Sequence, residues 1–202
     1  TVIAAGQTVT LGGTGNDLTG NVTLTGGAVT LVDTTATAIA GITATGALSV
    51  TSGGAITQSG AIDADSTSSF TAGANAITLT QAANDFTGAV SLSNSGTNNV
   101  GVTDANALDL GTVGVGQNLA VIASGAITDS GVSTIGGTST FDNSGGSNAA
   151  IDLGSASTYT GDVTFTTDAG SDVTINDSTA FVIQSGLNVN NLNLTAGGAV
   201  TD

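Results

Sequence analysis

The stretch ANALDLGTVGVGQNLAVIASGAITDSG, residues 105–131, contains the pattern that decides the fold of this chain. Leu108 and Leu110 are separated by one residue, and Leu119 and Val121 repeat this arrangement further along the stretch. A period of two places both members of each pair on one face of a β-strand. The Gly and Asn residues between the runs are typical of turns. The stretch therefore predicts short strands that are separated by tight turns.

The same pattern extends along most of the chain. Further alternating apolar pairs are Ile77/Leu79, Val90/Leu92, Ile151/Leu153, Val163/Phe165, Val173/Ile175 and Leu192/Leu194. Val, Ile and Thr favour strands, whereas Glu, Lys, Arg and Met, which would build the polar face of an amphipathic helix, are absent. We therefore expect an all-β protein.

The composition excludes several classes of function. The 202 residues include no Lys, Arg, His or Cys, and 15 acidic residues give a formal net charge of -15. Without His or Cys the chain has no ligands for a zinc finger, an iron–sulfur cluster or a haem, and no thiol nucleophile. Without Lys or Arg it has no counter-charge for nucleic-acid phosphates or for anionic membranes. We therefore expect no nucleic-acid partner, no membrane insertion and no resident cofactor.

The chain is also internally repetitive. Residues 1–20 align without a gap to residues 69–88, and the segment GAITQSG at 54–60 recurs as GAITDSG at 125–131 and as GAVTD at 198–202. The offsets predict one continuous unit, residues 1–202, that is built from repeats 1–68 and 69–139 and an incomplete third repeat, 140–202. Because the chain stops inside a repeat, we expect it to be a piece of a longer array.

Evenly spaced short strands fit either tandem β-sandwiches or a β-solenoid. The copies show no linkers, and aromatic residues are only 3% of the chain, which is little for a sandwich core. Val, Ile, Leu and Ala suit the narrow, stacked interior of a solenoid. The prediction is a β-solenoid of roughly ten coils of about 20 residues, which at about 4.8 Å per coil gives a rod of roughly 50 Å.

The segments NDFTGAVSL (84–92), 105–131 and STYTGDVTF (157–165) resemble the shaft repeats of filamentous-haemagglutinin-like adhesins and related autotransporter passengers. The resemblance covers essentially the whole chain, through loose patterns of Leu, Gly, Asn and Thr. It implies a right-handed parallel β-helix, secretion to a bacterial cell surface, and a structural or adhesive role. The chain departs from many such shafts in having no Lys or Arg.

Three Asp residues are weak candidates for binding a metal. Asp17 closes the segment Gly12-Gly13-Thr14-Gly15-Asn16-Asp17, which fits the GGxGxD core of calcium-binding β-rolls, although such motifs occur in tandem and this one occurs once. Asp63 and Asp65 lie two apart in the sequence, so a strand would point both carboxylates the same way. We interpret the first segment as an ordinary turn and the Asp pair as a solvated face, with Ca²⁺ bound loosely at most. A catalytic carboxylate pair is the alternative.

Recurring Asn and aromatic residues favour structural roles. Asn16 and Asn84 occupy equivalent positions, and their side chains are expected to satisfy turn amides as a polar ladder, as are those of Asn188, Asn190, Asn191 and Asn193. Large residues also recur at two equivalent sets of positions, one being Leu18, Phe86 and Tyr159 and the other Val2, Phe70 and Phe141. We predict that both sets pack in the core rather than form a carbohydrate platform.

Three functions remain open at this point. The preferred one is a non-catalytic shaft segment of a large secreted bacterial adhesin or fibre. The second is a self-assembling extracellular filament or matrix subunit, and the third is a polysaccharide-degrading β-helix enzyme that acts through Asp alone. The expected partners are neighbouring solenoid segments or subunits, end to end, and a host-cell or polysaccharide surface.

Overall fold

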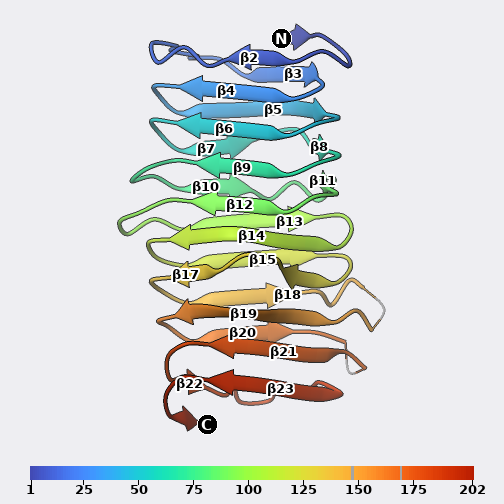
Figure 1. Ribbon diagram of the computed structural model, residues 1–202, viewed down its shortest axis with the longest axis vertical. Helices are drawn as coiled ribbons and strands as arrows, with labels where there is room; N and C mark the ends of the chain where they lie inside the picture. Colours follow the sequence, from blue (N-terminus) through green and yellow to red (C-terminus); the bar gives the residue numbers. More distant parts are fainter. Residues whose placement is uncertain (147, 169) are drawn as a thin grey trace.

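The computed structural model describes residues 1–146, 148–168 and 170–202, which form a stack of parallel coils. The described part contains twenty-four strands and no helix, and therefore no helix that could cross a membrane. The chain winds from one end of the stack to the other, so the N and C termini lie at opposite ends (Figure 1). The predicted all-β solenoid is confirmed.

Two sheets of eleven strands run along the stack, and the chain passes from one to the other about every half coil. The first, sheet A, contains β1 (Val2–Ile3), β3 (Val22–Gly26), β5 (Thr37–Ala44), β7 (Ile56–Gln58), β8 (Ile62–Ala64), β10 (Ile77–Leu79), β11 (Asp85–Phe86), β13 (Val100–Asp104), β15 (Leu119–Ala123), β18 (Ser139–Asp142) and β20 (Val163–Thr166).

The second, sheet B, contains β2 (Val9–Leu11), β4 (Val29–Asp33), β6 (Leu48–Ser52), β9 (Ser68–Thr71), β12 (Val90–Ser93), β14 (Leu108–Val115), β16 (Ile127–Asp129), β17 (Ser133–Ile135), β19 (Ile151–Tyr159), β21 (Asp172–Asp177) and β23 (Asn191–Ala196). Two further strands, β22 (Phe181–Val182) and β24 (Val200–Thr201), pair with each other.

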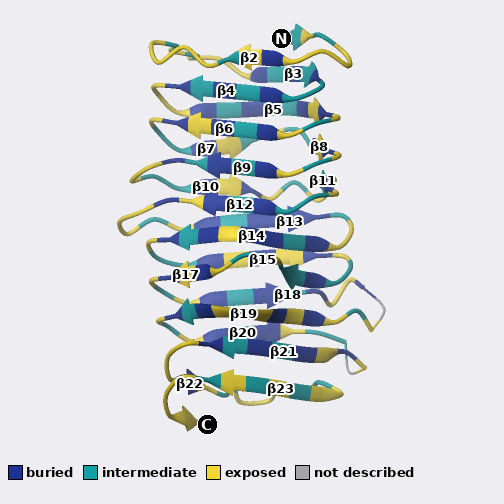
Figure 2. Ribbon diagram, viewed as in Figure 1, coloured by how far each residue is buried: buried dark blue, intermediate teal, exposed yellow. Residues whose placement is uncertain are grey.

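Successive coils pair in parallel and in register. Similar side chains of neighbouring coils therefore stack on one another. Leu31 pairs with Val50, and Val50 pairs in turn with Phe70, so the three side chains form one column through three coils. Burial alternates along the strands (Figure 2), so that every second side chain points inward, and most of the inward-facing side chains are apolar. The period-two pairs predicted from the sequence are buried, except Leu192 and Leu194, which are half-buried near the C-terminal end.

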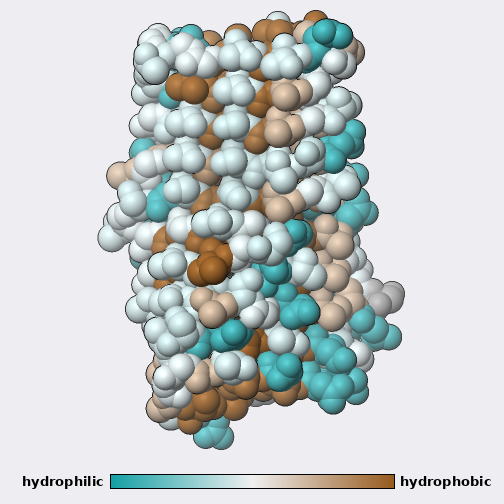
Figure 3. Space-filling model, in the orientation of Figure 1, coloured by the Kyte–Doolittle hydropathy of each residue, from teal (hydrophilic) through white to brown (hydrophobic). Residues whose placement is uncertain are grey.

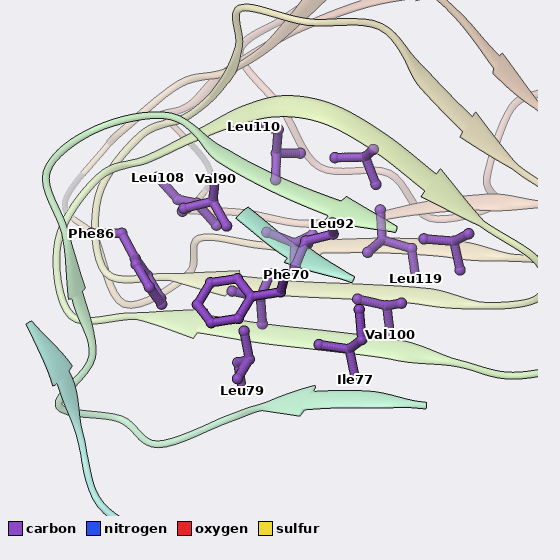
Figure 4. Packing of buried hydrophobic residues seen from close by; sticks show 14 of the residues in the cluster. Phe70, Ile77, Leu79, Phe86, Val90, Leu92, Val100, Leu108, Leu110 and Leu119 are labelled. Atoms are coloured by element: carbon purple, nitrogen blue, oxygen red, sulfur yellow. The ribbon is translucent and has the colours of Figure 1, made fainter. Parts of the chain in front are cut away.

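The interior is filled by aliphatic side chains and a few aromatic rings. Figure 4 shows Phe70 and Phe86 among Leu and Val side chains that come from both sheets. The rings of Phe70 and Phe86 meet edge to face with centroids 6.1 Å apart, and Phe141 and Tyr159 repeat this arrangement at 6.1 Å. The prediction of core packing for the recurring large residues is confirmed for these four, which are at most 1% exposed. Leu18 and Val2, their counterparts in the first repeat, are partly buried against the same core.

One sequence repeat does not correspond to a whole number of coils, but to a whole number plus one half. Moving forward by one repeat carries β5 of sheet A onto β14 of sheet B, and β6 of sheet B onto β15 of sheet A. The same exchange relates β9 to β18 and β13 to β21. Between β5 and β14 the chain crosses from one sheet to the other seven times, so one repeat makes seven half-turns. Equivalent residues of successive repeats therefore lie on opposite faces of the rod.

The first two repeats also each carry a bulge where one long strand faces two short ones. β5 pairs with both β7 and β8, and β14 pairs with both β16 and β17. Gly60 and Gly131 lie in the gaps between the short strands, and a Cβ atom on either would collide with the backbone of the preceding coil, at Ala40 and Gly111 respectively. The close approach of two coils therefore explains why glycine stands in both copies of the GAIT-x-SG segment.

The substitution Phe70→Ala tests the stacked core. Phe70 is fully buried between β6 and β12, so its removal leaves a cavity that the rigid coil cannot close. We expect the free energy of unfolding to fall by about 3–5 kcal/mol, measured by urea denaturation followed by circular dichroism. Ser69→Ala, which alters the adjacent outward-facing position, is the control and should change stability by less than about 0.5 kcal/mol. Equal losses in the two variants would contradict the described register.

Candidate functional site

One buried Asp recurs in each repeat at the end of equivalent strands. Asp33, Asp104 and Asp177 close β4, β13 and β21, and they are 2%, 1% and 1% exposed. Each carboxylate accepts the backbone N–H of the residue two positions ahead, with N···O distances of 3.1 Å from Thr35, 2.8 Å from Asn106 and 2.9 Å from Thr179. These bonds form tight turns that lead the chain into the next strand.

The same carboxylates also bind the preceding coil. They accept the backbone N–H groups of Leu18, Phe86 and Tyr159 at 3.3, 3.2 and 3.4 Å. These three residues are the large side chains that recur once per repeat. The buried Asp therefore fixes the backbone at the point where each large side chain enters the core.

Asn side chains complete the connection from the opposite direction. Asn16 Nδ2 donates to the carbonyl of Val32 at 3.0 Å, and Asn84 Nδ2 donates to the carbonyl of Thr103 at 3.1 Å. We call the pairs Asn16–Asp33 and Asn84–Asp104 the Asn–Asp clasps. The third repeat has Ser157 in place of the Asn and keeps Asp177. Since every clasp spans two coils, it locks their register with side chains as well as with the backbone.

Asn84 has the most complete set of partners. It is fully buried, and besides Thr103 it donates to the carbonyl of Leu79 at 3.1 Å and accepts the N–H of Ile62 at 2.9 Å. Its carboxamide also exchanges two hydrogen bonds with that of Gln58, at 2.8 and 2.9 Å. The predicted role of Asn16 and Asn84 in satisfying backbone groups is therefore seen directly in the geometry.

A family model matches two parts of the chain, residues 26–93 and 97–167, under the description "Repeats of unknown function (DUF5649)". Together these parts are more than two thirds of the chain. The chain belongs to the DUF5649 repeat family. Comparisons with curated proteins and with solved structures find no match. The two DUF5649 matches each contain one bulge and one buried Asp, Asp33 or Asp104.

The three metal candidates predicted from the sequence lie on the surface of the DUF5649 rod. Asp17 is exposed and accepts a hydrogen bond from Thr35 Oγ1 at 3.1 Å. Asp63 and Asp65 are both exposed, and Asp63 faces Asp85 of the next coil in register. Among the described residues no three acidic side chains gather as a metal site would require. Loose binding of Ca²⁺ at Asp17, Asp63 or Asp65 stays a prediction.

The Gly12–Asp17 segment forms a turn between β2 and β3. Asn16 N–H donates to the carbonyl of Gly13 at 3.2 Å, and the Asn16 side chain also donates to the carbonyl of Leu11 at 2.9 Å. The Asn16 side chain is thus bonded to the backbone on the inner side of the turn. This arrangement agrees with our interpretation of the segment as a turn.

The Asn-rich run near the C-terminus also makes a polar contact between coils. Asn190 and Asn191 both donate to Asp172 Oδ1, at 2.8 and 2.9 Å, and these bonds hold the pKa of that exposed carboxyl below its ordinary value.

Sequence reasoning missed Asp33, Asp104 and Asp177 because it compared the repeats by their most similar segments. A signal was present, since each Asp is followed three positions later by Ala, in the segments 33–36, 104–107 and 177–180. The spacing of the three Asp residues along the chain also matches the repeat. The sequence shows that the position recurs, but the partners of the carboxylate appear only in the folded coils.

Substituting Asn84 tests the clasp. Asn84→Ala removes the donor to the carbonyls of Leu79 and Thr103 and the acceptor for the N–H of Ile62. We expect stability to fall by about 3 kcal/mol or more, measured by chemical denaturation. Asn98→Ala is the matched control, because Asn98 also donates to two carbonyls, those of Ala74 and Ser95, but in an exposed turn. A cost for Asn84→Ala no larger than that of the control would rule out the clasp as a stabilising element.

The charge balance predicts an unusual response to pH. Burial raises the pKa of the Asp104 carboxyl, against the lowering effect of the N–H groups of Asn106 and Phe86, and Asp85 adds to the rise. Asp104 therefore binds its proton more tightly in the folded state, and this stabilisation is lost as pH rises through the folded-state pKa. The net charge of -15 has no Lys, Arg or His to balance it, so protonation also relieves repulsion between carboxylates.

We therefore expect the melting temperature to rise as pH falls from 7 to about 4.5, measured by thermal circular dichroism. The pKa of Asp172 is lowered, so protonation of this carboxyl lowers the stability of the fold. This opposite effect acts only below its ordinary pKa of 3.8. Added NaCl screens the repulsion between carboxylates. At pH 7 it should therefore raise the melting temperature by the part of the acid-induced rise that comes from this repulsion. A melting temperature that falls over this interval would contradict the prediction.

Proposed function

We propose that this chain is a non-catalytic shaft segment of a large secreted bacterial surface adhesin or fibre, similar to the filamentous-haemagglutinin-like adhesins. The observation that carries the proposal is the unbroken stack of in-register parallel coils, in which both main sheets extend along nearly the whole chain. Such a stack transmits load through backbone hydrogen bonds between coils. The shaft segment serves as a spacer and a mechanical support at the bacterial cell surface.

The surface chemistry supports this role. Figure 3 shows a face made mostly of residues of intermediate hydropathy, with hydrophilic residues gathered over the C-terminal coils. Acidic side chains keep a long rod soluble and attract cations loosely. The absence of Lys and Arg also leaves trypsin-like proteases without a cleavage site, which suits a protein exposed outside the cell.

The half-turn relation between repeats supports a shaft with two equivalent faces. A surface feature of one repeat recurs on the opposite face in the next repeat, and on the same face one repeat later. A shaft built in this way presents similar surfaces to neighbours on both sides. Its partners are neighbouring solenoid segments along the axis and a host-cell or polysaccharide surface at the far end of the fibre.

A self-assembling filament or matrix subunit is the second candidate. It is favoured by apolar side chains that are exposed near both ends of the stack, where Ile3 is 72% and Val200 is 48% exposed. The end strands also have one unpaired edge in the described residues, and such edges accept further strands. Subunits that stack end to end would cover both features.

The test combines imaging with an intact mass. Antibodies against this chain, coupled to gold, are applied to intact cells of the bacterium that produces the protein. We expect gold along extended surface fibres, and a natural protein far heavier than the 19.0 kDa of this chain. Labelling confined to the cell interior would refute the shaft. Regular fibres formed by the purified chain alone, with a natural mass near 19.0 kDa, would favour the filament instead.

A further inference from the structure

The bulges of the first two repeats differ at one inward-facing side chain. Gln58 ends β7 and pairs with Ile39, and Asp129, at the equivalent position one repeat later, ends β16 and pairs with Leu110. Both side chains accept the backbone N–H of the next coil through one oxygen. Gln58 Oε1 lies 3.1 Å from the N–H nitrogen of Gln81, and Asp129 Oδ1 lies 3.2 Å from that of Ser155.

The two positions differ at the second terminal atom of the side chain, which is Nε2 in Gln58 and Oδ2 in Asp129. In the first repeat Gln58 Nε2 donates to the carbonyl of Gly60 at 3.0 Å and to Asn84 Oδ1 at 2.8 Å. In the second repeat the corresponding atom is Asp129 Oδ2, which is buried and has no hydrogen-bond partner among the described residues. The residues equivalent to Gly60 and Asn84 are Gly131 and Ser157. An ionised carboxylate cannot donate to a carbonyl, whereas a protonated one can.

The surroundings of Asp129 offer no positive charge. Asp152 and Tyr159 lie on β19 in the next coil, and Asp109 lies on β14 in the preceding coil. Burial raises the pKa of the Asp129 carboxyl, and Asp152 adds to the rise against hydrogen bonds from Ser155 and Gly154. Burial raises the pKa of Tyr159 to about 12, so its hydroxyl stays neutral. A hollow of about 240 Å³, lined by Thr128, Asp129, Asp152, Gly154 and Ser155, gives solvent protons access.

We propose that Asp129 is held in the folded coil as the neutral carboxylic acid at mildly acidic pH, with its Oδ2–H donating to the Gly131 carbonyl as Gln58 Nε2 donates to Gly60. Proton loss at higher pH breaks this bond and leaves a half-buried anion beside Asp152. The second repeat thus carries a pH-sensitive contact where the first carries a pH-insensitive amide. The contact is independent of the proposed function, because it concerns only the coil.

The direct test is a pH titration of the Asp carboxyl carbons in the complete chain by carbon-13 NMR, with Asp129 assigned through Asp129→Asn. We expect Asp129 to titrate above its ordinary pKa of 3.8. Exposed Asp65 supplies the internal reference. Titration of Asp129 at or below the value for Asp65 would overturn the proposal.

Two substitutions exchange the chemistry of the bulges. Asp129→Asn supplies a permanent donor, so its melting temperature at pH 7 should exceed that of the wild type by about 2–4 °C, and the gain should vanish near pH 3. Gln58→Glu should install the same pH dependence in the first repeat. Asp65→Asn removes a charge without touching the bulge and sets the baseline. An Asp129→Asn gain equal to that of Asp65→Asn at every pH would overturn the proposal.

A bound cation is the competing explanation for the orphaned oxygen, and it gives a different result. Melting temperatures are compared at pH 7 with Ca²⁺ and with a chelator, in wild type and in Asp129→Asn. We expect the same small Ca²⁺ effect in both proteins. A Ca²⁺ stabilisation that is present in wild type and absent from Asp129→Asn would assign the site to a cation. It would overturn the proposal that Asp129 is protonated there.

Discussion

The parallel hydrogen-bond ladder between successive coils is the constraint on which the rest of the structure depends. Each strand pairs in register with the strand one coil before it, so every coil must return the chain to the same place after about 20 residues. Side chains in equivalent places then stack directly upon one another. The interior accepts Leu, Val and Ile at almost every position because these residues fit a narrow space of constant width.

Departures from a uniform coil are repaired by buried polar groups. Where one long strand faces two short ones, the backbone leaves the ladder and its N–H and C=O groups need other partners. Asn84 and Gln58 supply them at one such bulge, and Asp104 binds the N–H of Phe86 in the coil that contains Asn84. A buried carboxylate is costly without a cation, and in this chain backbone N–H groups take the place of Lys and Arg. The acidic composition is therefore compatible with a folded core because most of the buried acids are bound by the main chain.

Much of the fold could be predicted from spacing alone. The alternation at Ile77/Leu79 and Val90/Leu92 identified strands and their inward faces, and the recurrence of Phe70 and Phe141 identified core positions. The candidate site was predicted less well. Asp63 and Asp65 are exposed, as expected of a solvated face, but the sequence did not single out Asp33, Asp104 and Asp177, which make the recurrent contacts. Those contacts join residues that are a whole coil apart in the sequence, and no local pattern indicates them.

The sequence by itself determined that this protein is all-β, repetitive, acidic and built from coils, because side-chain periodicity and turn residues act over a few positions. Only the tertiary structure decided that one repeat makes seven half-turns, since that number depends on how many residues each coil uses when it closes on the ladder. It also decided that Gln58 and Asp129, which stand at equivalent places in successive repeats, differ in the partners that their terminal atoms find. Both terminal atoms of Gln58 have hydrogen-bond partners, whereas Asp129 Oδ2 has none among the described residues.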